Sequence, residues 1–178
     1  ASLREQEDEW KIASLCKVLL KYAAWLEEFD HMLDSAYRVV SRFEDCLMDH
    51  PRLKLRLLEL ELAIVRRIEA LNNHELSHAE DLEREISLYK RNIYFADNDQ
   101  LDSIEQTGYG LKKDPVEWTA RWEEVIDEAD RMTEEKLKDH PRGMGFCHGF
   151  WHERQKALRK LGVVWRCPTE MNPGTMFD

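Results

Sequence analysis

The sequence predicts an all-α fold: a long antiparallel helical hairpin over residues 1–94, a linker at 95–113, and a smaller helical unit at 114–178 that ends in an irregular, docked tail. Three observations predict this architecture. Apolar residues recur every three or four positions over long stretches, which places them on one face of a helix. Glycine (7) and proline (5) are scarce in the 178 residues, whereas an all-β fold needs many turn residues. Charged residues make up 35%, which is typical of helices with long solvated faces.

The first arm of the hairpin is predicted as one helix from about Leu3 to Met48. Its apolar stripe contains Leu15, Val18, Leu19, Tyr22, Leu26, Phe29, Leu33, Ala36, Val40, Phe43 and Leu47. No glycine or proline interrupts the segment, so the pattern favours a single rod of roughly 60–70 Å, at about 1.5 Å per residue. A kink near residues 30–34 is compatible with the pattern, but nothing in the sequence compels one.

The second arm is predicted from about Pro51 to Tyr94. Proline cannot continue a helix, but it fits the first turn of the next one, so the arm begins at Pro51 with Asp49 or His50 as its cap. Its stripe is looser and contains Leu55, Leu58, Leu62, Val65, Leu76, Ala79, Ile86 and Tyr89. Two such stripes would bury each other as an antiparallel hairpin.

The weak point of the second arm is Asn72-Asn73. Asn72 and Glu75 have the spacing of a capping box, which would start a separate helix at this point. The sequence leaves open whether the helix continues through this dipeptide.

The carboxy-terminal unit is expected to contain two helices. Asp114-Pro115 predicts the start of the first, with the aspartate as its cap and the proline in the first turn. The second is predicted from about Met144 to Leu161, closed by Gly162. We expect Trp118, Trp122, Trp151 and Trp165 to join these helices and the tail in one core.

The segment that follows these helices is less regular. Residues 163–165 form the only strand-like run, and it is too short to make a sheet alone. The tail after Pro168 is predicted to be irregular and docked by its apolar residues.

The charge of the chain is uneven. The formal net charge is −10, and residues 95–140 alone contain fourteen acidic and six basic residues, whereas residues 141–178 are mildly basic. This balance disfavours direct nucleic-acid binding, which needs clustered Lys and Arg. It allows a partner with a basic surface. The leading interpretation is therefore a non-enzymatic protein–protein interaction module, an inhibitor or adaptor that acts through helical surfaces and forms a homo-oligomer.

The cysteines and the apolar runs bear on location. The four cysteines lie far apart without a Cys-x-x-Cys pair, which is typical of reduced thiols and favours a cytoplasmic protein. The amino-terminal residues are polar and acidic, unlike a signal peptide. The apolar runs are too short for a membrane span, so no contact with a membrane is expected.

The segment His74-Glu75-Leu76-Ser77-His78 carries the sharpest motif. It resembles the zinc metallopeptidase signature, in which two histidines one helical turn apart bind zinc and the glutamate polarises the attacking water. That resemblance covers five residues. It implies a metal-dependent enzyme with His74 and His78 as ligands and Glu75 as the catalytic group. The competing interpretation is a solvated helix face.

A second metal hypothesis rests on two Glu-x-x-His pairs, Glu28 with His31 and Glu75 with His78. Two such pairs, with one further glutamate from each of two other helices, make the di-metal site of some four-helix bundles. The pairs would have to face the interior of the bundle.

A third hypothesis is a structural zinc in the carboxy-terminal unit. His148 and His152 are one turn apart on the predicted last helix, which suits two ligands of one ion. Cys147, Cys167 and His140 could complete the site. The alternative is that the aromatic residues nearby form a core and the histidines bind backbone carbonyls or water, so that zinc is possible but no cofactor is required.

Overall fold

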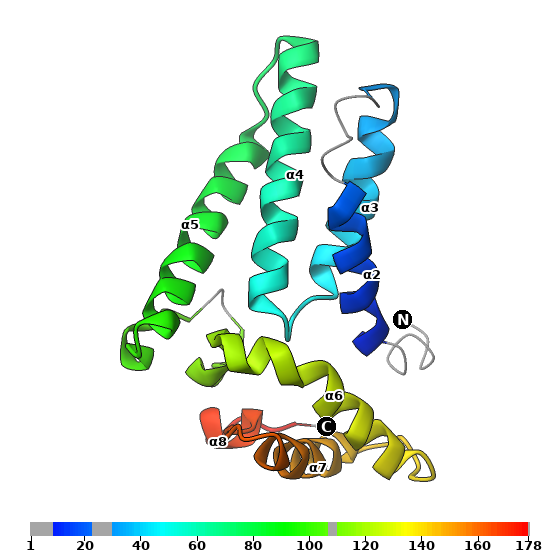
Figure 1. The fold of residues 1–178 in the computed structure, drawn as a ribbon, viewed down its shortest axis with the longest axis vertical. Helices are drawn as coiled ribbons and strands as arrows, with labels where there is room; N and C mark the ends of the chain where they lie inside the picture. The colour runs from blue at the N-terminus through cyan, green and yellow to red at the C-terminus, as the bar shows by residue number, and fades with distance from the viewer. Residues whose placement is uncertain (1–8, 23–29, 107–109, 178) are drawn as a thin grey trace. The chain divides into compact units, whose positions relative to one another are not determined.

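The computed structural model describes residues 9–22, 30–106 and 110–177 (Figure 1), and the side chains of residues 9, 10, 22, 44 and 45 lie outside that description. It confirms the all-α class, because the described residues form helices and connecting turns, without a strand. The chain divides into two compact units, Ala1–Arg91 and Asn92–Asp178. The division falls inside a helix.

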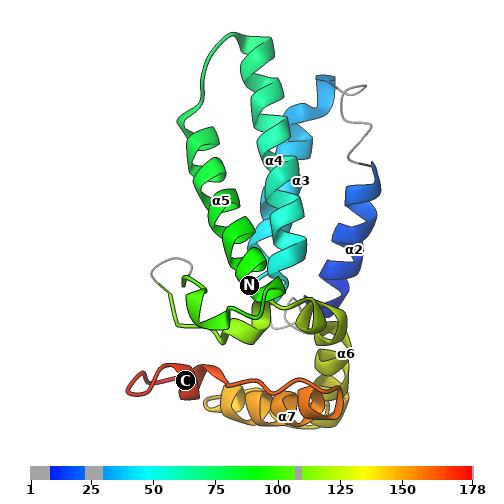
Figure 2. The same ribbon diagram turned by 60° about the vertical axis from the view of Figure 1, so that its left-hand side comes forward.

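Unit 1 contains α2 (Glu9–Tyr22), α3 (Leu33–Asp45), α4 (Pro51–Asn72) and most of α5 (Ser77–Asp97). Figures 1 and 2 show these helices running in alternate directions. The prediction of one continuous first helix is wrong: α2 ends at Tyr22, and a 3-10 turn at residues 30–32 precedes α3. Both helices pack against α4. Two short helices can cover the same face of α4, whereas a straight rod would leave half of its apolar stripe bare.

The core of unit 1 lies between α2, α3 and α4. Its buried residues are Ala13, Cys16, Leu33, Val40, Leu47, Leu53, Leu57, Leu60 and Ile64. On α2 the small residues Ala13 and Cys16 face inward, both at 0% exposure. Leu15 and Val18, which the predicted stripe assigns to the core, are 56% and 48% exposed. The reason is rotational: turning the small side chains toward α4 turns their large neighbours outward.

Helix α4 begins as predicted, with Pro51 in its first turn and His50 at the N-cap position, although His50 makes no side-chain capping bond. The helix ends at Asn72, and Asn73 closes it in the left-handed conformation with φ 49°. The question that the sequence left open is answered: the helix does not continue through Asn72-Asn73, and the separate helix that follows begins only at Ser77, without a capping box at Asn72 and Glu75. The second arm is therefore two antiparallel helices with a four-residue turn between them.

Helix α5 contacts α4 through apolar and charged groups. Its buried residues within unit 1 are Ala79, Leu82, Ile86 and Tyr89. Ion pairs flank them: Lys54 with Glu85 at 3.3 Å, and Lys90 with Glu59 at 2.7 Å.

Unit 2 contains the end of α5, α6 (Ala120–Leu137), α7 (Phe146–Lys160), α8 (Pro168–Met171) and two short 3-10 helices at Leu101–Ser103 and Pro115–Trp118. The boundaries follow the predicted chemistry in two places. The Asp114 carboxylate accepts a hydrogen bond from the Val116 N–H at 3.3 Å, and Gly162 ends α7 with φ +85°. The predicted start of the α-helix at Asp114-Pro115 is wrong, because Pro115 starts a 3-10 helix instead and α6 begins only at Ala120. Thr119 caps α6 by accepting from the Trp122 N–H at 3.1 Å.

The core of unit 2 is aromatic. Its buried residues are Trp122, Val125, Ile126, Ala129, Ala157, Leu158, Val163, Trp165 and Cys167. The prediction that the carboxy-terminal tryptophans form a core holds for Trp122 and Trp165, while Trp151 is half-buried at its edge. Trp118 is also buried. The tail is more regular than predicted, because it contains α8.

The segment of residues 163–165 is extended but unpaired with any strand of the described chain. No helix in the described ranges has the length and apolar character that crossing a bilayer requires.

Candidate functional site

The predicted zinc motif does not lie on one helix. Since α5 begins at Ser77, His74 belongs to the preceding turn, and the one-turn spacing that two ligands need is missing. His78 instead has its Nε2 3.6 Å from Oε1 of the buried Glu61 and packs edge-on against the Tyr37 ring, with centroids 6.0 Å apart. Both histidines and Glu75 are exposed.

The described residues cover the predicted di-metal pairs only in part. Glu28 lies outside the described residues, and His31 is exposed. Glu75 precedes α5, so the Glu-x-x-His spacing at this point is not helical.

The carboxy-terminal histidines lie where predicted, on α7, but they face rings and solvent. His148 packs edge-on against Trp151 and Phe177, and His152 is exposed. Cys147, also on α7, is half-buried. The Cys167 thiol is 2.9 Å from the Thr169 hydroxyl. Over residues 9–22, 30–106 and 110–177, no three or more His, Cys, Asp or Glu side chains gather in a way that could hold a metal ion.

The turn between α4 and α5 is ordered by a carboxylate that the sequence analysis missed. Glu69 is 8% exposed. Its Oε1 accepts the Leu76 N–H at 2.6 Å, and its Oε2 accepts from Arg66 at 2.8 Å. Arg66 also donates to Glu83 at 2.6 Å, which ties α4 to α5. The Leu76 N–H, together with Arg66, lowers the pKa of Glu69 below its usual value.

This turn holds its conformation while presenting its own side chains to solvent. Residues 70–78 are exposed, although the backbone N–H of Leu76 is bound by Glu69. Two of them are large and apolar: Leu71 is 52% exposed and Leu76 is 37% exposed. Leu76 belongs to the stripe that the sequence predicts to be buried, and it lies outside the core because it precedes the first turn of α5. The turn is therefore a rigid, partly apolar surface.

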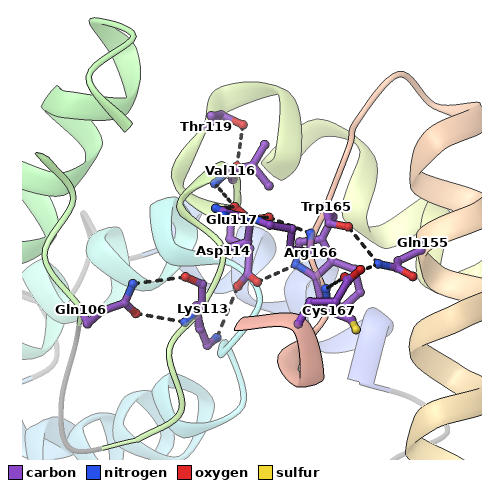
Figure 3. A network of polar contacts seen from close by, with 11 residues as sticks. Gln106, Lys113, Asp114, Val116, Glu117, Thr119, Gln155, Trp165, Arg166 and Cys167 are labelled. Atoms are coloured by element: carbon purple, nitrogen blue, oxygen red, sulfur yellow. Dashed lines mark hydrogen bonds and ion pairs between the residues drawn. The ribbon is translucent and has the colours of Figure 1, made fainter. Parts of the chain in front are cut away.

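Unit 2 contains a network of polar contacts between distant segments (Figure 3). The buried Asp114 accepts from the Arg166 N–H at 2.7 Å and from the Arg166 guanidinium at 3.0 and 3.1 Å. This contact raises the pKa of Arg166 above its usual value. The buried Glu117 accepts from the Trp165 indole at 2.7 Å. Both carboxylates therefore bind groups about fifty residues away in sequence. Contacts of this kind hold distant segments of the chain together.

A third carboxylate of this network caps α8. Glu170 accepts the Cys167 N–H at 2.8 Å and the Gln155 amide at 2.6 Å, and Gln155 also donates to the Trp165 carbonyl. The Cys167 N–H contributes most to lowering the pKa of Glu170.

Side-chain amides fix the loop between α5 and the 3-10 helix at Pro115. The amide of Asn92 both donates to and accepts from the backbone of Glu105, at 2.7 and 2.9 Å. Gln106 pairs with Lys113 in the same two-way manner, and Asn172 pairs with Lys112. Each amide replaces the two backbone bonds that a neighbouring strand would supply.

The acidic character of α6 is largely balanced within the unit. Of its seven carboxylates, five form ion pairs with basic side chains of unit 2, namely Glu124, Glu128, Asp130, Glu134 and Glu135. The Arg154 guanidinium donates two hydrogen bonds to the Asp130 carboxylate, at 2.6 and 2.8 Å. The same guanidinium lies over the ring of Trp122.

Comparison with known proteins returned no matching family model, no matching curated protein and no matching solved structure.

Proposed function

We propose that the chain is a non-enzymatic helical module that binds another protein through exposed apolar positions of unit 1. The supporting observation is that Leu15, Val18 and Leu76 fit the apolar periodicity of the sequence yet are 56%, 48% and 37% exposed. Isolated exposed leucines need no explanation, but apolar residues that share a helix face mark interaction surfaces.

The pairing of the acidic residues within unit 2 supports apolar contact as the main source of affinity for a protein partner. The acidic segment that led us to expect a basic partner is largely paired within unit 2, because five of the seven α6 carboxylates have Arg or Lys partners. The three exposed pairs, of Glu124, Glu128 and Glu135, cost little to rearrange, so the acidic surface contributes to choice of partner and to solubility.

The chemistry needed for an enzyme has less support. The candidate residues His74 and Glu75 lie in a solvent-exposed turn and His78 is exposed at the start of α5. Glu61 and Tyr37 contact the His78 ring. In unit 2, the buried carboxylates Asp114 and Glu117 accept bonds from Arg166 and Trp165, which leaves them committed to the fold.

Affinity capture from the native host tests the proposal. Wild-type protein is compared with a Leu15→Gln/Val18→Gln variant and with a Leu71→Gln/Leu76→Gln variant. Val164→Gln is the matched control, because Val164 is 74% exposed in unit 2. We expect one or more proteins to be captured by the wild type and the control and lost with at least one unit 1 variant. Capture that is equal for all variants, or absent for the wild type, contradicts the proposal.

A further inference from the structure

Two exposed surfaces of unit 1 have complementary compositions. The first lies on the solvent face of α2. Leu15 and Val18 are three residues apart and therefore neighbours on one face of the helix. Lys11 precedes Leu15 by four residues and Lys21 follows Val18 by three, so the same face presents lysine, two aliphatic side chains and lysine, all exposed. We call this set the α2 face.

The second surface is the α4–α5 turn with the adjoining ends of both helices, and the name is used for this whole set below. Leu71, at the end of α4, and Leu76 supply its apolar part. Glu75 precedes Leu76, and Glu80 lies in the first turn of α5. Both carboxylates are exposed and make no ion pair within the described part of the chain. The bonds of Glu69 to Leu76 and Arg66 fix the backbone of the turn. The turn therefore presents two leucines and two carboxylates in a preformed arrangement, which lowers the ordering cost of binding.

We propose that the α4–α5 turn of one copy binds the α2 face of a second copy of this chain. The proposal rests on the proposed function only in taking the exposed apolar positions as protein contacts. Aliphatic pairs meet in the centre, and lysines meet glutamates at the rim. Pairing turn with turn or α2 face with α2 face would place like charges together, which costs affinity. The combination of turn with α2 face is the one without that repulsion.

A second copy fits the turn better than other occupants. The carboxylates of the turn repel a phosphate backbone, and the chain itself carries the lysine-flanked aliphatic pair that the turn requires. Because both surfaces belong to the same unit, two copies related by a two-fold axis can make the contact twice. The small area of each contact predicts a weak, concentration-dependent dimer.

Sedimentation equilibrium of the full-length purified chain, from about 10 µM to about 1 mM, tests the proposal. Three charge variants are compared with the wild type: Lys21→Glu, Glu75→Lys/Glu80→Lys, and the combination of all three changes. We expect each of the first two to weaken dimerisation at least about tenfold. The combined variant restores part of the lost affinity, because Lys21→Glu then faces the two substituted turn positions with opposite charge, while Lys11 is unchanged. Added salt weakens the wild-type dimer.

Asp139→Lys is the matched control, since Asp139 is exposed in unit 2 and the change in charge is the same as that of one turn substitution. Circular dichroism checks that each variant folds, and the substituted side chains are all exposed. Three results overturn the proposal. The wild-type chain stays monomeric over the whole concentration range, the charge variants dimerise as strongly as the wild type, or the combined variant dimerises no more strongly than the two variants it combines.

The outcomes separate this proposal from the proposed function. A monomeric chain that still captures a host protein through Leu71 and Leu76 keeps the function and removes the self-association. A dimer that follows the charge exchange, in a chain that captures no host protein, keeps the self-association and removes the function.

Discussion

The two units use polar side chains in different ways. In unit 1 the ion pairs lie at the partly exposed margins of α4 and α5, as with Lys90 and Glu59, whose side chains are 57% and 44% exposed. Unit 2 has exposed ion pairs along α6 as well, but it also has buried polar groups that join distant segments, as with Glu117 and Trp165, 48 residues apart. Long helices satisfy most of their own backbone, so unit 1 assembles mainly through apolar stripes, and the turn between α4 and α5 is where a side chain, Glu69, accepts a backbone N–H. Unit 2 has longer irregular connections, and its backbone groups need side-chain partners.

The largest expected effect is in the core of unit 2. Trp122 is fully buried, stacks near Trp165 at 5.8 Å and lies beneath Arg154. Trp122→Ala should lower the free energy of unfolding by about 3–5 kcal/mol, and urea titration followed by circular dichroism measures it. Leu57→Ala in the core of unit 1 should cost about 2–5 kcal/mol. A loss below 1 kcal/mol for Trp122→Ala would contradict the aromatic core.

The buried anchor should have the next largest effect. Glu117→Ala leaves the Trp165 indole N–H without its acceptor, and should cost about 1.5–3 kcal/mol, the range for hydrogen bonds to charged groups. Glu117→Gln keeps an acceptor and should lose less than half as much. Chemical denaturation of both variants measures the difference. Equal losses of unfolding free energy in the two variants would show that the contact between Glu117 and Trp165 depends on the charge of Glu117 and not on the presence of an acceptor.

Acid should weaken both units through carboxylates whose pKa is lowered in the folded state, Glu69 in unit 1 and Glu170 in unit 2. The unfolded chain then binds protons first, so this stability is complete above the ordinary glutamate pKa of about 4.3 and is lost as the pH falls through the folded value. Glu69→Gln should reduce the protons taken up on acid unfolding by up to about one. Unfolding curves from pH about 6 to about 3 measure this uptake. An unchanged pH dependence in Glu69→Gln would contradict the role of Glu69.

The smallest effect is expected for an exposed ion pair of unit 1. Lys90→Ala should change the free energy of unfolding by about 0–1 kcal/mol, and the difference should shrink in high salt. Urea titrations at low and high salt measure it. A loss comparable to that of Glu117→Ala would remove the contrast between the two units.

Features that depend on neighbouring residues were predictable from the sequence. Pro51 and Gly162 act on the backbone within one or two residues of themselves, so their helix boundaries needed no tertiary information. Asp114 acts locally too, but it caps a 3-10 helix, and the α-helix predicted there begins at Ala120. The break within the first arm was not predictable in this way. Neither glycine nor proline marks residues 23–32, and one apolar stripe serves equally for one long helix or for two short helices that fold onto the same partner.

The candidate sites could not be predicted from the sequence for the same reason, because they depend on contacts between distant residues. The spacing of His74 and His78 resembles a metal motif only if both lie on one helix, and the position of Ser77 at the start of α5 removes that condition. The position of α5 depends in turn on Glu69, seven residues before Leu76. No pattern of neighbouring residues predicts the bond between Glu69 and Leu76. The same holds for the bond between Asp114 and Arg166, which are 52 residues apart.

The amides of Asn92, Gln106 and Asn172 each use a donor and an acceptor at a fixed reach from the backbone. No other side chain of the same length offers both, since the matching carboxylate lacks the donor and leucine lacks both groups. Aliphatic core positions such as Leu57 and Ile64 accept several replacements of similar volume. Among descendants of this gene, unit 1 can therefore drift in sequence while it keeps its fold, whereas unit 2 permits few substitutions at the three amides that bind the backbone of its loop.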